Sequence, residues 1–365
     1  MVQAEQLTAP FPYFGGKRHV APMVWDLLGD VEAYVEPFAG SAAVLLGRPE
    51  VKGHRREVLN DLDGWITNLW RAIRDRPDEV MSYAGGPVME LDLHARLAWL
   101  RERNNGELAD WLAGDPEHCD PKAAAWWLSA TIGSIGGGTN RGPWKSDGEY
   151  LRKTRGAKDG ICRAIPHLGQ GRAGMRVLAA DLPALSARMR NVVITCGDWK
   201  RPLSKNLRHY TTVGVLLDPP YEDSKRTSDG QEIYQHDSAD VSAEVRAWCA
   251  KAPRDWRIVL CGYDDEHDEL VDRGWRKLTP PKAVSSGYNV TDLNSQRDRL
   301  WVSPACLELN TQQAFDFDAL LAHGSADPSP CCAACDRFGD DGDPTARGCG
   351  LPGCGCHNHT NGRSR

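Results

Sequence analysis

The segment Asp218-Pro219-Pro220-Tyr221 follows an apolar run, Val213–Leu217, that is typical of a buried strand. Two consecutive prolines supply no backbone N–H donors, so their carbonyl groups stay available as acceptors. Asp218 adds a carboxylate and Tyr221 adds an aromatic ring. Because an amino group on a planar base is held by acceptors and a stacking face, this segment is a candidate site for such a group. The alternative, an ordinary surface turn, is disfavoured by the strand directly before it.

A second candidate site is a turn of small residues around Gly40, after another strand-like run. Gly40 gives this turn backbone freedom, which lets the chain approach a bound ligand closely. Asp61 ends the next strand-like run, where a carboxylate commonly binds ribose hydroxyls. The alternative is an ordinary strand-to-helix connection, with Asp61 as the N-cap of a helix over Trp65–Arg71. The residues of this site are Glu36, Pro37, Phe38, Ala39, Gly40, Ser41 and Asp61.

Strand-like and helix-like segments alternate around both sites. We expect strands at Ala33–Phe38, Glu57–Leu59, Val192–Cys196, Val213–Leu217, Arg257–Cys261 and Leu300–Val302, and helices at Ser41–Leu46, Ile66–Ile73 and Val241–Lys251. This alternation predicts βαβ units and a parallel, doubly wound sheet of the α/β class. Ligands bind such sheets at the carboxyl ends of the strands, where both candidate sites fall.

The alternation is interrupted over residues 85–185. Two helix-like segments, His94–Arg103 and Ala123–Ile132, precede a Gly-rich loop at Gly133–Gly142. We interpret this region as an inserted, mainly helical domain. It divides a main domain into residues 10–84 and 186–304, and residues 305–365 form a Cys-rich tail.

Taken together, the motifs resemble the Dam-like, D12 class N6-adenine-specific DNA methyltransferases. The resemblance covers roughly Pro10 to Pro304, and the parts follow one another in the family's order. Ala42 departs from the pattern, because family members usually carry a second glycine there. The matching parts are Tyr13-Phe14-Gly15-Gly16-Lys17, Glu36-Pro37-Phe38-Ala39-Gly40, Asp61, the insertion, and Asp218-Pro219-Pro220-Tyr221.

The resemblance implies a Rossmann-like methyltransferase fold with an inserted helical DNA-recognition domain, and S-adenosylmethionine as cofactor. Lys17 would lie near the cofactor carboxylate or the target base, and Asp61 would bind the ribose. Asp198 would meet the cofactor's adenine, and Trp199 would pack on that ring. The implied cofactor-binding residues are Tyr13, Phe14, Gly15, Gly16, Lys17, the Glu36–Ser41 turn, Asp61, Asp198, Trp199 and Asp218.

The activity that the resemblance implies is site-specific methylation of N6 of an adenine flipped out of double-stranded DNA, carried out by a monomer. Asp218 and the carbonyl of Pro219 would accept hydrogen bonds from the target amine. Pro220 would line the same site, and Tyr221 would stack on the adenine ring. Three alternatives stay open. An N4-cytosine DNA methyltransferase more often has Ser at the first motif position. A protein-glutamine methyltransferase has Asn before Pro-Pro-Tyr. A DNA-binding relative could have lost catalysis.

Charge is distributed unevenly along the chain. The net charge of −6 excludes a uniformly basic nucleic-acid-binding surface. Between Gly136 and Arg176, however, nine Lys and Arg stand against three Asp and Glu. Inside the insertion we interpret this segment as a DNA contact, although a solvated face is the alternative. The predicted DNA-binding residues are Arg141, Lys145, Arg152, Lys153, Arg155 and Lys158.

Six of the twelve cysteines crowd between Cys331 and Cys356. Closely spaced cysteine pairs can form a tetrahedral zinc site, but the C-x-C spacing here is not the usual one. A structural zinc site and a disordered thiol-rich tail therefore both stay open. The zinc ligands would be Cys332, Cys335, Cys354 and Cys356.

The remaining features predict a cytoplasmic protein. No apolar run approaches the ~18 residues that a membrane-spanning helix needs. The segment Met1–Phe14 lacks the basic and apolar blocks of a signal peptide.

Overall fold

The computed structural model describes residues 7–11, 16–50, 53–84, 90–103, 107–133, 144–146, 151–153, 182–220, 239–281 and 297–309. Contacts divide the chain into two compact units, Met1–Glu308 and Leu309–Arg365. The helices and strands given below all lie in the first unit.

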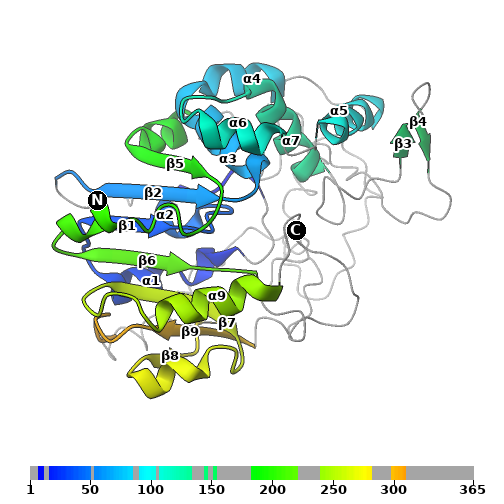
Figure 1. Ribbon diagram of the computed structural model, residues 1–365. Helices are drawn as coiled ribbons and strands as arrows, with labels where there is room; N and C mark the ends of the chain where they lie inside the picture. Colours follow the sequence, from blue (N-terminus) through cyan, green and yellow to red (C-terminus); the bar gives the residue numbers. More distant parts are fainter. Residues whose placement is uncertain are drawn as a thin grey trace, which may run out of the picture. The chain divides into compact units, whose positions relative to one another are not determined.

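A seven-stranded sheet forms the centre of this unit, with the order β5-β2-β1-β6-β7-β9-β8 (Figure 1). Neighbouring strands among the first five are parallel, whereas β9 is antiparallel to both β7 and β8. The α/β class is therefore confirmed, but the expectation of a wholly parallel sheet was wrong at one edge. The strands are β1 (Ala33–Glu36), β2 (Arg56–Asp61), β5 (Val192–Cys196), β6 (Val213–Leu217), β7 (Arg257–Tyr263), β8 (Arg276–Leu278) and β9 (Asp298–Val302).

Both faces of the sheet are covered, as the alternation of side chains along β1 shows. Ala33 and Val35 belong to a core cluster with Val245 of α9 (Ala239–Cys249). Tyr34 points to the opposite face, where its ring lies 4.7 Å from that of Trp25 in α1 (Ala21–Leu28). Buried residues therefore alternate between two apolar layers, as a sheet with helices on each side requires.

The helices that follow β2 pack around α3 (Gly64–Asp75). The side chain of Asp63 caps α3 by accepting the N–H of Trp65, so Asp63 and not Asp61 is the N-cap. The helix α7 (Pro121–Gly133) contacts α3, α4 (Pro77–Ala84) and α5 (Glu90–Glu102), and α6 (Glu107–Gly114) contacts α3 and β5. A separate inserted domain over residues 85–185 stays a prediction. No helix of the described ranges is long and apolar enough to span a membrane.

Arg71 on α3 connects this helical region to the sheet. Its side chain is 1% exposed. Its guanidinium donates to the carbonyls of Ile194 (3.1 Å), Leu112 (3.0 Å), Asp115 (2.8 Å) and His118 (3.2 Å). One side chain thus satisfies acceptors on β5, α6 and the turn that follows α6.

We expect Arg71→Met to lower the free energy of unfolding by about 3 kcal/mol or more, because it leaves several buried carbonyls without donors. Urea unfolding at constant pH measures this loss. Arg74→Met is the matched control, since Arg74 lies on the same helix and donates to one strand carbonyl, that of Val192. Equal losses in the two variants would contradict the role assigned to Arg71.

Candidate active site

The candidate residues gather where the parallel strands end. Asp218 follows β6 directly, Glu36 ends β1, and Asp61 ends β2. Because neighbouring parallel strands finish at one edge of a sheet, motifs far apart in the sequence are brought to that edge. The short helix η1 (Lys17–His19) adds Lys17 to the same region.

The turn after β1 is held by hydrogen bonds from two sides. The N–H of Gly40 donates to Asp61 Oδ2 (2.8 Å), and the indole N–H of Trp70 donates to the Gly40 carbonyl (2.9 Å). The other oxygen of Asp61 accepts the N–H of Asp63 (2.9 Å). Asp61 therefore holds the turn after β1 to the start of the segment that leads into α3.

Ala42 occupies the left-handed region, with φ 50° and ψ 27°. This conformation costs a residue with a Cβ about 1–2 kcal/mol, whereas glycine adopts it freely. Ala42, where this sequence departs from the family pattern, is therefore a position at which glycine would adopt the backbone conformation without strain. The helix α2 (Ala43–Leu46) begins directly after it.

We expect Ala42→Gly to change the free energy of unfolding by less than about 1 kcal/mol, because relief of the left-handed strain offsets the added freedom of the unfolded chain. Ala43→Gly, one residue later and inside α2, should cost about 1 kcal/mol. Thermal unfolding of both variants measures the difference. A greater loss in Ala42→Gly than in Ala43→Gly would contradict this account.

Asn60 joins the ends of three strands and is 1% exposed. Its amide Nδ2 donates to the carbonyls of Pro37 (3.1 Å) and Gly197 (2.8 Å), and its Oδ1 accepts from the Thr195 hydroxyl (2.8 Å). Asn60 and Trp70 were not predicted as site residues. Asn60 could have been identified from its position, because it is a polar amide at the end of an apolar strand and directly precedes a candidate ligand carboxylate.

The segment after β5 carries Asp198 and Trp199. Asp198 is exposed and accepts the N–H of Lys200 (2.7 Å). Trp199 is buried, and its ring stacks on Phe38 at 6.0 Å and 25°. Its predicted contact with the cofactor's adenine stays a prediction, and the partly buried Phe38 is the more accessible of the two rings.

Lys17 forms an ion pair with Asp218, with 2.8 Å between Nζ and Oδ2. The two side chains are 11% and 21% exposed, respectively. Burial by itself lowers the pKa of Lys17, but the charges of Asp218 and Asp298 together outweigh it and raise that pKa. Lys17 is therefore a cation at any physiological pH, and it orients the carboxylate of the candidate catalytic motif.

Asp298 is a further carboxylate at this edge that the sequence analysis did not identify. It begins β9 and pairs in register with Tyr263 at the end of β7. Because β9 is antiparallel, its first residue lies where the parallel strands end. Burial raises the pKa of Asp298 to about 6, while the positive charge of Lys17 acts in the opposite direction.

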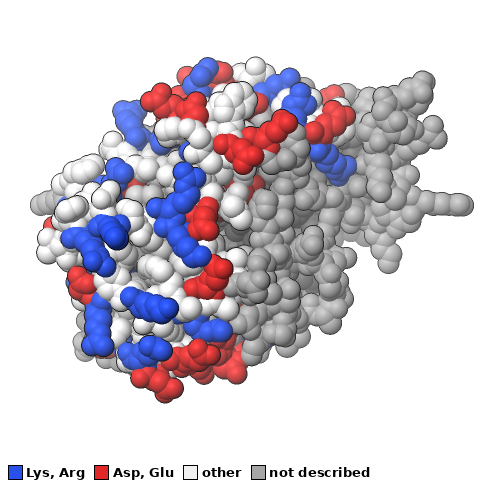
Figure 2. Space-filling view, viewed as in Figure 1, with Lys and Arg blue, Asp and Glu red and all other residues white. Residues whose placement is uncertain are grey.

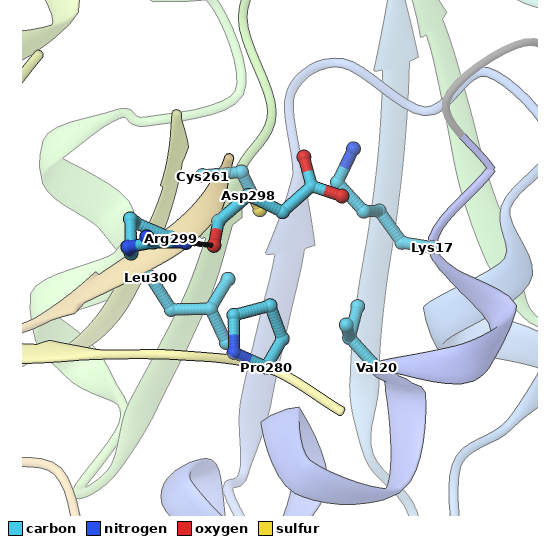
Figure 3. Close-up of a pocket in the computed structure, with 7 residues that line it drawn as sticks. All are labelled: Lys17, Val20, Cys261, Pro280, Asp298, Arg299 and Leu300. Atoms are coloured by element: carbon cyan, nitrogen blue, oxygen red, sulfur yellow. Dashed lines mark hydrogen bonds between the residues drawn. The ribbon is translucent and has the colours of Figure 1, made fainter. Parts of the chain in front are cut away.

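Figure 3 shows the Asp298 carboxylate pointing toward the Lys17 ammonium in a small pocket. The thiol of Cys261 lies beside them, and burial raises its pKa well above the ordinary value. Lys17 is thus placed between two carboxylates, Asp218 and Asp298. The pocket is lined by Lys17, Val20, Cys261, Pro280, Asp298, Arg299 and Leu300.

Glu36 is a buried carboxyl at the end of β1, 3% exposed. The Tyr34 hydroxyl donates to its Oε2 at 3.1 Å. Burial raises the pKa of Glu36 to about 8; the Tyr34 hydrogen bond opposes this rise, and the negative charge of Asp218 adds to it. A cation bound nearby would favour the ionised form of this group.

Some of the predicted DNA-binding residues lie in two short described strands, and other predicted site residues lie outside the described part of the chain. Lys145 lies in β3 (Trp144–Ser146), and Arg152 and Lys153 lie in β4 (Leu151–Lys153). These strands form an antiparallel pair in which Lys145 is opposite Arg152 and Trp144 is opposite Lys153. The predicted residues that are not described are Tyr13, Phe14, Gly15, Tyr221, Arg141, Arg155, Lys158, Cys332, Cys335, Cys354 and Cys356.

Within the described residues, no group of three or more His, Cys, Asp or Glu side chains is placed to hold a metal ion. The suggested zinc site in the tail falls outside those residues and has no support from them.

The sheet and its edge define a class of protein. A mostly parallel α/β sheet with a tight glycine turn after one strand and a carboxylate after the next is the arrangement of a nucleotide-cofactor-binding domain. Residues 13–95 match the family model of the D12 class N6 adenine-specific DNA methyltransferases.

This match confirms the family resemblance predicted from the motifs. It covers the segment from Tyr13 to Lys17, the Gly40 turn and Asp61, and it ends before β5 and Asp218. The family supports a DNA N6-adenine methyltransferase in general terms, with S-adenosylmethionine as methyl donor and DNA as substrate. No curated protein matches the chain.

Proposed function

We propose that this protein is a site-specific DNA adenine N6-methyltransferase that acts on an adenine flipped out of duplex DNA. The observation that carries the proposal is the placement of Asp218 at the same sheet edge as the Gly40 turn and Asp61, beyond the residues that match the family. A carboxylate beside a cofactor turn is suited to accept from an exocyclic amine that faces the methyl donor.

The residues at the edge fit S-adenosylmethionine by their chemistry. Asp61 is a carboxylate at the strand end where ribose hydroxyls are commonly bound, and buried Glu36 supplies a carboxylate that a sulfonium cation stabilises in its ionised form. When bound, S-adenosylmethionine supplies an electrophilic methyl carbon on a sulfonium.

Asp218 and the Pro219 carbonyl accept from the two hydrogens of the target amine, which makes the nitrogen lone pair available for attack. Methyl transfer would join the amine nitrogen to the donor's methyl carbon as that carbon leaves the sulfur, and the surplus proton of the amine would pass to Asp218 or to water. Lys17 holds the Asp218 carboxylate in place through the ion pair, and Asp298 offers Lys17 a second carboxylate while Asp218 engages the base.

Methylation assays on the purified protein test the proposal. Tritium transfer from labelled S-adenosylmethionine to duplex DNA, followed by mass analysis of the nucleosides, should yield N6-methyladenine. N4-methylcytosine would establish the alternative base, and binding to DNA without transfer would identify an inactive relative. Single-molecule sequencing of DNA from expressing cells would then give the target sequence.

We expect the affinity for S-adenosylmethionine to rise with pH until the pH passes the Glu36 pKa of about 8. Below that value the folded protein holds a proton on Glu36, and a bound cation favours its release. Calorimetry in two buffers of different ionisation enthalpy measures the released proton. Glu36→Gln should flatten the dependence around that pH, and an unchanged profile in this variant would contradict the assignment.

The same group affects stability in the opposite direction. Because the pKa of Glu36 is higher in the folded than in the unfolded chain, its contribution to stability is largest at low pH and is lost as the pH rises toward 8. Urea unfolding of wild type and Glu36→Gln above that pH separates this effect from binding, since the variant should be the more stable of the two.

A further inference from the structure

Three cations lie over two tryptophan rings on α5 and α7, and we call these five residues the cation–indole cluster. The rings of Trp99 and Trp126 meet edge to face at 5.0 Å. Arg103 lies 3.7 Å above the Trp99 ring, Arg96 lies 5.7 Å from the Trp126 ring, and Lys122 reaches both rings at 5.3 and 4.5 Å. The cluster therefore concentrates positive charge on partly buried or exposed side chains.

The charges of this cluster are not neutralised within the described residues. Asp92 attracts Arg96, but none of Arg96, Arg103 and Lys122 forms an ion pair with any described carboxylate. On the face seen in Figure 2, basic and acidic side chains of the described residues are intermingled.

Two other cations of the protein that lie over tryptophan rings make a useful contrast. Lys200 lies over Trp199 and pairs with Glu244 at 2.6 Å. Lys277 lies over Trp301 and pairs with Asp268 at 2.8 Å. In both cases the cation over the ring also forms an ion pair with a carboxylate. The cations of the cation–indole cluster form no such pair with a described carboxylate.

The position of the cluster relates it to the basic hairpin and to the active site. The helix α5 contacts β3, where Lys145 is paired in register with Arg152 of β4. On α7, Trp127 follows Trp126 and packs against Phe11 at 5.3 Å, a few residues before Lys17. The two helices that carry the cluster therefore contact β3, through α5, and Phe11, through Trp127 of α7.

We propose that the cation–indole cluster binds phosphates of the DNA backbone. This inference rests on the proposed function and adds a contact surface to it. Phosphates would supply the negative charge that the described carboxylates do not, and indole faces hold the cations in place before DNA arrives, which reduces the ordering cost of binding. Such contacts give affinity and register without reading the base sequence.

The slope of log affinity against log salt concentration tests the proposal on one fixed duplex. Each cation that neutralises a phosphate contributes about −0.9 to this slope. The triple variant Arg96→Gln, Arg103→Gln, Lys122→Gln should therefore make the slope less negative by up to about 2.7 units. The double variant Lys200→Gln, Lys277→Gln is the control, because it removes cation–π pairs of the same kind that already have carboxylate partners, and its slope should equal that of wild type.

Single variants separate charge from packing. Arg103→Gln should make the slope less negative by about 0.9, whereas Arg103→Lys should keep it unchanged. Melting temperatures confirm that each variant is folded before its binding is measured. If wild type methylates DNA and the slope of Arg103→Gln and of the triple variant equals that of wild type, the cluster does not contact phosphate and the proposed function stands. If wild type itself neither binds nor methylates DNA, the proposed function and the cluster proposal both fail.

Discussion

Replacing Asp218 with alanine should abolish methyl transfer while the affinity for S-adenosylmethionine stays within about tenfold of wild type, a change of no more than ~1.4 kcal/mol. The variant removes the carboxylate that would accept from the target amine. The Gly40–Asp61 hydrogen bond lies elsewhere on the edge and stays in place. Lys17 keeps Asp298 as a nearby carboxylate, so the substitution does not leave a buried cation without a counter-charge.

Equilibrium binding and methyl transfer must be measured on one preparation. Asp264→Asn is the matched control, since Asp264 follows β7 at the same edge but pairs with Arg297 at 2.8 Å. Asp264 also has a positive φ of 45°, which asparagine tolerates. Turnover in Asp218→Ala at one-tenth of wild type or more would refute the catalytic assignment.

Asp61→Ala should raise the apparent Michaelis constant for the cofactor more than about tenfold. A charge-assisted hydrogen bond to a hydroxyl contributes roughly 1.5–3 kcal/mol, so the loss of one is sufficient. The structure adds a second reason, because Asp61 also holds the N–H of Gly40 and thereby the turn after β1. Both effects act on cofactor binding and not on the target base.

Asp63→Ala distinguishes this role from a merely local one. Asp63 lies two residues away and caps α3, so its loss should cost about 1 kcal/mol of stability and leave the Michaelis constant near wild type. Steady-state kinetics and unfolding curves on both variants give the comparison. If Asp61→Ala leaves the Michaelis constant unchanged, Asp61 is only a backbone anchor.

The apolar runs predicted the central strands well, because buried parallel strands are continuous in hydrophobicity. The bounds of β5 and β6 agree with the expected ranges, and β7 extends two residues further than expected, to Tyr263. The direction of β9 could not be predicted, since an apolar run does not encode whether its strand is parallel or antiparallel. The helix α1 was also missed, although a Pro in its first turn and Gly29 at its end are recognised helix signals.

The motifs predicted which residues meet at the site, but not how they are connected. That Asp218 and Asp61 reach one edge follows from strand order alone. The ion pair between Lys17 and Asp218 could be found only from the fold, because the two residues are far apart in the sequence. Asp298 was hidden for a related reason, since its place at the edge depends on the antiparallel direction of β9.

The Asn60 amide has a consequence for how the cofactor side of the site responds to binding. One side chain holds the segments after β1 and β5 to the end of β2, so these three segments cannot shift independently. Ligand binding there should therefore occur without rearrangement of the backbone, and exchange of the hydrogen-bonded amides of Ala39, Gly40 and Gly197 should already be slow in the free protein. Association at this half of the site would then be limited by diffusion and desolvation and not by folding of a loop.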